Sequence, residues 1–172
     1  MELECGNLIL RPITLEDTDN ILTWRNKPSV KKFFIHQKDI SRKEHINWMK
    51  TKVDTGNVIQ FIIIEKQNAH PIGSVYLQNI DLLNKKAEFG IFIGEDHLTS
   101  RGFGAAAAEC VIKYAFDKME LHKLYLRVYE DNSRAISSYL KAGFKKEAVL
   151  KDDVYIDGKY RNIVLMGVLN SK

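Results

Sequence analysis

The chain has 172 residues, of which 45% are hydrophobic and 28% are charged. This length and composition predict a single globular domain, 1–172, that buries a core without a disulfide framework or a metal cluster. The chain carries 26 basic and 22 acidic residues, a net charge of +4. Because its lysines occur in isolated pairs and form no basic stripe, we expect no nucleic-acid partner.

The two cysteines, Cys5 and Cys110, are too few for a metal cluster and lack CxxC spacing. Cys110 lies in an apolar helical stretch, which predicts a buried free thiol, and nothing requires an oxidising compartment. Residues 1–6 lack the features of a signal peptide, and the apolar run 61–64 is too short to span a bilayer. We therefore expect a cytoplasmic protein with no membrane partner.

The first half of the chain predicts a strand, two helices and three further strands. A strand is expected over residues 8–11, followed by a helix that begins near Thr14 and ends before Pro28. A capping box at Ser41 and Glu44 begins the second helix. Strands follow over 58–65, 72–80 and 87–93.

The strand over 87–93 has two distinct faces. Alternation places Phe89 and Ile91 on the face directed to the core, and Glu88, Gly90 and Phe92 on the opposite face. A glycine inside a strand often marks a bulge or the close approach of the backbone to a ligand. Gly90 is therefore interpreted as one of these two features.

The second half predicts a glycine-bearing loop, a helix, a strand, a second helix and two closing strands. The loop spans 99–104, the second helix begins after Asn132, and Asp157-Gly158 forms a hairpin turn between the last strands. The whole order, β-α-α-β-β-β-α-β-α-β-β, is typical of an α/β domain with helices covering a mixed sheet of about seven strands.

The glycine-bearing loop indicates a phosphate site. Gly102 and Gly104 precede or open a helix whose N-terminal N–H groups attract anions, and Ser100 and Arg101 add a hydroxyl and a charge. The loop lacks the Walker pattern, so hydrolysis of a Mg-nucleotide is not expected. A second strand–helix junction at Asn132 predicts a cleft between the two helix starts.

Several motifs together resemble the GNAT acetyltransferases, and in particular the branch of ribosomal-protein and spermidine N-acetyltransferases. These motifs are Leu10-Arg11, Trp24-Arg25-Asn26, Ala87 to Gly94, Arg101-Gly-Phe-Gly104, Asn132 to Phe144, and Tyr155 to Asn162 followed by Met166. The resemblance implies a mostly antiparallel sheet that is splayed to form a cleft for acetyl-CoA, with no metal. It also implies a small-molecule or peptide amine as acceptor: a protein N-terminus, a polyamine or an amino sugar.

The resemblance assigns the cosubstrate contacts residue by residue. Main-chain groups of Ile91, Phe92 and Ile93 would hold the pantetheine and the acetyl carbonyl. The remaining implied contacts are Thr99, Ser100, Arg101, Gly102, Phe103, Gly104 and Ala105 in the pyrophosphate loop, with Asn132 and Ala135 in the next helix. Thr99 departs from the family's Gln or Arg, which a loop acting through its backbone should tolerate.

The expected chemistry needs a proton donor and a base. Tyr139 is the predicted acid for the departing thiolate, the alternative being that it only packs in the core. Glu88 is the predicted base, against the alternative of an ion pair, because the fifth-strand position where some relatives carry a glutamate is Arg127. His36, His45 and His97 are interpreted as surface residues. No cysteine nucleophile is needed, so direct transfer is expected.

The acceptor wall is predicted to contain Trp24, Arg25, Asn26, Phe34 and Trp48, although helix packing explains the aromatic residues equally well. The acidic residues expected around a polyamine are not obvious, although Glu16, Asp17 and Asp39 could contribute. The missing glutamate and Thr99 leave one alternative open, a non-catalytic CoA-binding regulatory module. A homodimer is a further expectation.

Overall fold

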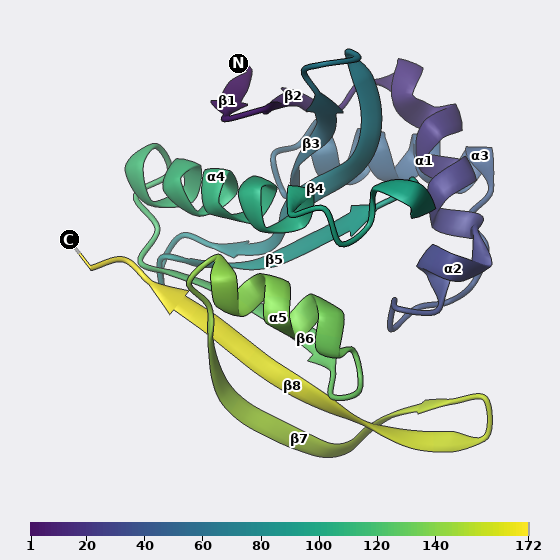
Figure 1. Ribbon diagram of the computed structural model, residues 1–172, viewed down its shortest axis with the longest axis vertical. Helices are drawn as coiled ribbons and strands as arrows, with labels where there is room; N and C mark the ends of the chain where they lie inside the picture. Colours follow the sequence, from purple (N-terminus) through teal and green to yellow (C-terminus); the bar gives the residue numbers. More distant parts are fainter. Residues whose placement is uncertain (172) are drawn as a thin grey trace.

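The chain, described over residues 1–171 in a computed structural model, forms one open sheet of eight strands with helices on both faces (Figure 1). The strand order across the sheet is β1-β2-β3-β4-β5-β6-β8-β7. The strands are β1 (Leu3–Cys5), β2 (Leu8–Pro12), β3 (Ile59–Glu65), β4 (His70–Asp81), β5 (Lys86–Ile93), β6 (Lys123–Tyr129), β7 (Lys145–Ile156) and β8 (Lys159–Leu169). All neighbours are antiparallel except β5 and β6. The predicted α/β fold with a mixed, mostly antiparallel sheet is confirmed.

The prediction of about seven strands misses β1. This strand has only three residues, too few to show an alternating pattern, and it pairs with β2 across a turn in which Gly6 has a φ of 60°. The helices are α1 (Thr18–Asn26), α2 (Pro28–Lys31), α3 (Arg42–Trp48), α4 (Phe103–Asp117) and α5 (Ser133–Lys141). None of the helices in residues 1–171 is long and apolar enough to cross a membrane.

Local signals in the sequence explain where several elements begin. Ser41 and Glu44 form the predicted capping box, in which the Ser41 N–H donates to Glu44 Oε2 at 2.8 Å and the Glu44 N–H donates to Ser41 Oγ at 3.3 Å. Pro28 does more than end the preceding helix, since it occupies the first turn of α2. The Asp157-Gly158 turn joins β7 and β8 in a long hairpin that extends from the body of the molecule (Figure 1).

Alternate residues of the central strands pack on opposite faces. Ile63 and Phe89 belong to the larger core beneath α4 and α5, whereas Ile62 and Phe92 belong to a second core shared with α1 and α2. The predicted division of the strand over 87–93 into two faces is therefore correct. Two separate layers of helices result, one on each side of the sheet.

The sheet splits between β5 and β6. Only Lys86 to Glu88 pair with Lys123 to Tyr125, although β5 continues to Ile93 and β6 to Tyr129. Beyond Glu88 the two strands no longer pair with each other. The helices that follow them, α4 and α5, begin beyond this opening, so the predicted splay is present.

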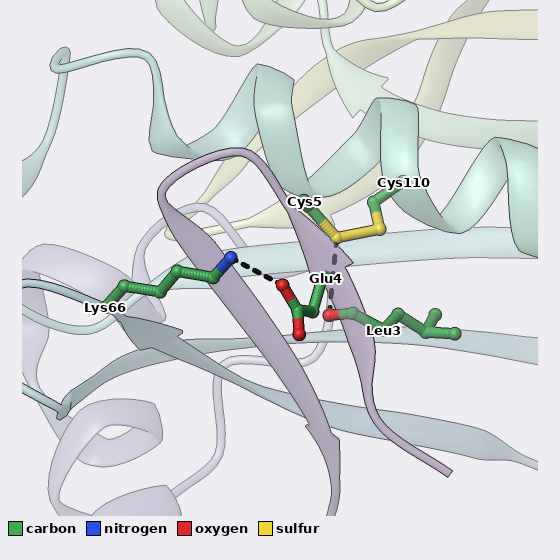
Figure 2. Close-up of a disulfide and its surroundings, with 5 residues drawn as sticks. All are labelled: Leu3, Glu4, Cys5, Lys66 and Cys110. Carbon is green, nitrogen blue, oxygen red and sulfur yellow. Dashed lines mark hydrogen bonds and ion pairs between the residues drawn. A yellow bond between two sulfur atoms is a disulfide. The ribbon is translucent and has the colours of Figure 1, made fainter.

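The expectation of a free thiol at Cys110 is wrong. Cys110 of α4 forms a disulfide with Cys5 of β1, with the two Cα atoms 5.8 Å apart (Figure 2). Figure 2 also shows an ion pair of β1 next to the disulfide. In this pair Glu4 Oε2 of β1 lies 2.9 Å from Nζ of Lys66, the residue that follows β3. The two cysteines are 105 residues apart in the chain. Only the packing of β1 beside α4 brings them together, and sequence periodicity does not show that packing.

Candidate active site

A cavity of about 1040 Å³ occupies the opening between β5 and β6. Residues of β3, β4, β5 and β6 line it, together with residues of α1 to α3, the first turn of α4 and most of α5. It extends from the loop before α4 to the segment between α2 and α3. A concave site at the ends of strands and helices is the usual place for a substrate.

The first turn of α4 presents backbone N–H groups to this cavity. Gly102 caps α4 with a φ of 84°, in the left-handed region that favours glycine. The first helical hydrogen bond runs from the Ala106 N–H to the Gly102 carbonyl at 3.1 Å. The N–H groups of residues 103–105 therefore precede the helical ladder, at the positive end of the helix dipole. This arrangement suits a phosphate group.

Nearly all the predicted cosubstrate residues line the cavity. They are Ile91, Phe92, Ile93, Thr99, Ser100, Gly102, Phe103, Gly104, Ala105, Asn132 and Ala135. Arg101 does not line it, and its guanidinium lies 5.6 Å from the Phe103 ring centroid. Asn132 caps α5, since its Oδ1 accepts the Ala135 N–H at 3.3 Å. Its side-chain amide N–H groups are not used by that cap.

Tyr139 approaches the opening from the α5 side of the sheet. Its ring packs edge-on against Phe89 and Phe144, with centroid distances of 6.1 and 6.0 Å, and the residue also lines the cavity. Burial raises the pKa of Tyr139, and the neighbouring Tyr76 raises it further. The phenol is therefore protonated at neutral pH and can act as a donor. Its role as an acid stays a prediction.

Glu88 lies on the opposite face of β5. It is 7% exposed, and its Oε2 accepts a hydrogen bond from Asn79 Nδ2 at 2.7 Å. Its Oε1 lies 3.4 Å from Arg127 Nε, so the ion pair named as the alternative does form. Both residues line the cavity. Glu88 reaches the site already paired, and its role as a base stays a prediction.

The predicted acceptor residues divide into two groups. Arg25, Phe34 and Trp48 line the cavity, whereas Trp24 and Asn26 do not. The Trp24 ring packs over Gly94, where any side chain would collide with it, and its Nε1–H donates to Glu95 Oε1 at 2.9 Å. Asn26 Oδ1 accepts a hydrogen bond from the Ile40 N–H at 2.8 Å, and Asn26 Nδ2 donates one to the Ile40 carbonyl at 2.9 Å. These contacts are structural, and they join α1 to its neighbours.

Sequence reasoning missed Tyr76 and misplaced His45. The Tyr76 ring lies over Gly90, where an added side chain would collide with it, and this explains the glycine in that strand. Alternation along 72–80 could have placed Tyr76 on that face. The expectation that His45 is a surface residue is wrong: it is 4% exposed and stacks on Trp48 with a centroid distance of 5.9 Å. His36 and His97 are exposed as expected.

A family model described as the acetyltransferase (GNAT) domain matches residues 7–145. The chain belongs to the GNAT acetyltransferase family. The resemblance noted from the motifs is thereby confirmed. This GNAT chain is an N-acetyltransferase that uses acetyl-CoA, and the donors of residues 103–105 at the end of a long cavity fit such a phosphate-bearing cosubstrate.

Named relatives of this GNAT chain act on polyamines. It is 32% identical to spermidine N(1)-acetyltransferase of Vibrio cholerae over 116 residues, which span 67% of this chain and 66% of the relative. It is 29% identical to the Escherichia coli K12 spermidine N(1)-acetyltransferase over 157 residues, or 91% and 83% of the two chains. A crystal structure of the Vibrio enzyme with CoA and spermine superimposes with a TM-score of 0.90 at 26% identity, covering 97% of this chain and 98% of that one.

The comparisons favour an enzyme over the regulatory CoA-binding module considered above, since the named relatives are acetyltransferases.

Among residues 1–171 no group of three or more histidine, cysteine, aspartate or glutamate side chains is placed to hold a metal ion.

Proposed function

We propose that this N-acetyltransferase transfers the acetyl group of acetyl-CoA directly to a primary amine at the opening between β5 and β6. The observation that carries the proposal is the loss of pairing after Glu88, which lets groups from both faces of the sheet reach the same edge of β5. Tyr139 approaches from the face of the sheet covered by α4 and α5, and Glu88 from the opposite face. The spermidine specificity named for two relatives supports an amine acceptor.

The chain would hold acetyl-CoA along the cavity. The N–H groups of residues 103–105 would bind the pyrophosphate, with Ser100 and the Asn132 amide beside them. Main-chain groups of Ile91 to Ile93, left without a partner strand on the β6 side, would bind the pantetheine and polarise the acetyl carbonyl. Arg101 lies outside the cavity lining, so we assign it at most an indirect contribution.

The proposed transfer forms one carbon–nitrogen bond and breaks one carbon–sulfur bond. Glu88, or a water molecule that it binds, accepts the proton of the attacking amine, which must be neutral to have a free electron pair. Tyr139 donates a proton to the departing thiolate. Because burial raises the pKa of Tyr139, it acts mainly by hydrogen bonding to the sulfur as charge develops. Both cysteines are in the disulfide and neither lines the cavity, which supports direct transfer.

Amine-dependent release of CoA thiol, measured with a panel of peptides, polyamines and amino sugars, tests this function. The expected result is thiol release with a matching acetylated product in the mass spectrum. Tight CoA binding without turnover for any amine would favour the non-catalytic module instead.

We further propose that residues 1–172 act as a single cytoplasmic domain that assembles with copies of itself. The exposed β7–β8 hairpin, with Tyr155 and Tyr160 64% and 66% exposed, offers a surface for assembly. A dodecameric structure of the Vibrio spermidine N-acetyltransferase supports self-association. Light scattering of the purified chain distinguishes a monomer from a dimer or a larger assembly.

A further inference from the structure

Arg25 is a partly buried cation for which residues 1–171 provide no ion-pair partner. Its Nη1 is inaccessible to solvent and has no hydrogen-bond partner among residues 1–171. The guanidinium carbon lies 3.4 Å from the centroid of the Phe34 ring, so one face of the group is covered by an aromatic surface. Burial lowers the pKa of Arg25, and the nearby Tyr76 partly offsets that effect. An unpaired buried charge is costly, and an incoming anion would remove that cost.

The acidic groups of the cavity are in the opposite situation. Each of its four carboxylates already faces a cation: Asp39 with Lys31 at 2.6 Å, Glu44 with Lys38 at 3.4 Å, Glu88 with Arg127 at 3.4 Å, and Asp96 with Lys27 at 3.8 Å. A polycationic acceptor would have to compete with these three lysines and one arginine for the carboxylates. The charge that remains unmatched inside the cavity is positive.

A second polar group that lines the same cavity is buried. His45 is 4% exposed, and neither ring nitrogen has a hydrogen-bond partner within residues 1–171. Burial lowers the pKa of His45, as does the positive charge of Arg42. A neutral imidazole offers one donor and one acceptor. An acceptor molecule with a hydroxyl or amide group would satisfy it.

Arg25 is connected through two aromatic side chains to β5, the strand proposed to hold the acetyl group. It interacts electrostatically with Tyr76, whose ring lies over Gly90 of β5. The Phe34 ring beneath its guanidinium contacts Phe92 of the same strand, with centroids 5.7 Å apart. An anion bound to Arg25 would therefore lie about one aromatic ring from the β5 edge, on the acceptor side.

We infer that the acceptor amine also carries an anionic group, a carboxylate or a phosphate, which Arg25 binds, with a hydrogen-bonding group beside His45. The inference rests on the proposed amine acetylation and specifies its substrate class. Guanidinium is suited to this task because its planar donors match two oxygens of a carboxylate or phosphate at once. Arg25 is thus a specificity-determining residue.

Matched amines that differ in one anionic group test the inference. Thiol release is measured for γ-aminobutyrate against butylamine, phosphoethanolamine against ethanolamine, and glucosamine phosphate against glucosamine, with spermidine as the polycation. We expect kcat/KM to be at least about tenfold higher for the anionic member of a pair, the effect of one hydrogen-bonded charge. Comparing the kcat/KM of the carboxylate-bearing amine with those of the phosphate-bearing amines identifies which anion is preferred. Equal or faster turnover of the neutral amines or spermidine would overturn the inference.

Variants of Arg25 locate the effect. Arg25→Gln should raise the KM of the anionic acceptor by about tenfold and abolish the preference, while leaving the KM of acetyl-CoA unchanged. Arg25→Lys, which keeps the charge but loses the planar donors, should restore part of the preference and serves if the glutamine variant does not fold. Lys113→Gln removes an exposed cation of α4 that lies outside the cavity lining, and it should change nothing. A parallel rise in the KM of acetyl-CoA would show that Arg25 binds the cosubstrate instead.

Calorimetry separates this inference from the proposed function. γ-Aminobutyrate and phosphoethanolamine are titrated into the chain in the presence of CoA, which has no acetyl group to transfer. Binding that is lost in Arg25→Gln, without turnover of any amine in the kinetic assay, would support the anion site while refuting the proposed transfer. Absence of both binding and turnover would overturn the anion site.

Discussion

Tyr139 shows how one residue serves packing and chemistry together. Its ring contacts Phe89 and Phe144, while the residue lines the cavity from α5. We predict that Tyr139→Phe keeps the fold and the CoA affinity, because the ring contacts remain. Its kcat should fall by about 10²-fold or more, the usual contribution of a positioned proton donor. Steady-state kinetics with a separate CoA titration checks this, and an unchanged kcat would leave Tyr139 a packing residue only.

Glu88 is held by two partners that orient its carboxylate. Its oxygens contact Asn79 at 2.7 Å and Arg127 at 3.4 Å. If Glu88 accepts the amine proton, Glu88→Gln leaves deprotonation to the solvent. The rate should then follow the fraction of amine that is neutral in solution, and an alkyl amine has a pKa of ~10.4. The pH profile of kcat/KM should therefore move to higher pH. A profile that does not move would assign the proton to a water chain without Glu88.

At the scale of elements, the disulfide fixes the edge strand β1 to α4, the helix whose first turn faces the cavity. Closing a loop between residues 105 positions apart restricts the unfolded chain. Reduction should lower the free energy of unfolding by about 2–4 kcal/mol. Denaturant unfolding with and without reductant measures the change.

The double variant Cys5→Ser, Cys110→Ser is the control for that experiment. It should have the stability of the reduced chain and no further response to reductant. An oxidised chain with the stability of the double variant would mean that the bond does not contribute to folding. Mass spectrometry after thiol alkylation shows whether the bond is formed in the purified chain, since the thiol pools of a reducing compartment oppose disulfides.

The sequence predicts elements well where a local pattern determines them. Alternation in 87–93 correctly separates Phe89 from Glu88, and the Ser41 and Glu44 pair correctly marks the start of α3. It misses β1, which is too short for a pattern, and the disulfide, which depends on distant packing. The burial of His45 depends in the same way on a cavity that several elements build together.

For the whole molecule, the net charge of +4 is uninformative alone. The distribution of charge in the cavity says more: its four carboxylates each lie near a cation, whereas Arg25 Nη1 has no hydrogen-bond partner within residues 1–171. We therefore expect the cavity to favour anionic groups. A polyanionic cosubstrate and an anionic acceptor fit that expectation. The sequence contains Arg25 in a recognisable motif, but only the fold shows that its Nη1 has no hydrogen-bond partner in the described part of the chain.

Acetyl-CoA is proposed to lie in the opening between β5 and β6, with its pyrophosphate at the start of α4. Hydrogen–deuterium exchange of the full chain with and without CoA measures whether it binds there. We expect slower exchange in peptides that cover residues 91–93 and 103–105, and little change in the β7–β8 hairpin. Saturating CoA that protects neither of those two segments, or protects only other parts of the chain, would contradict it.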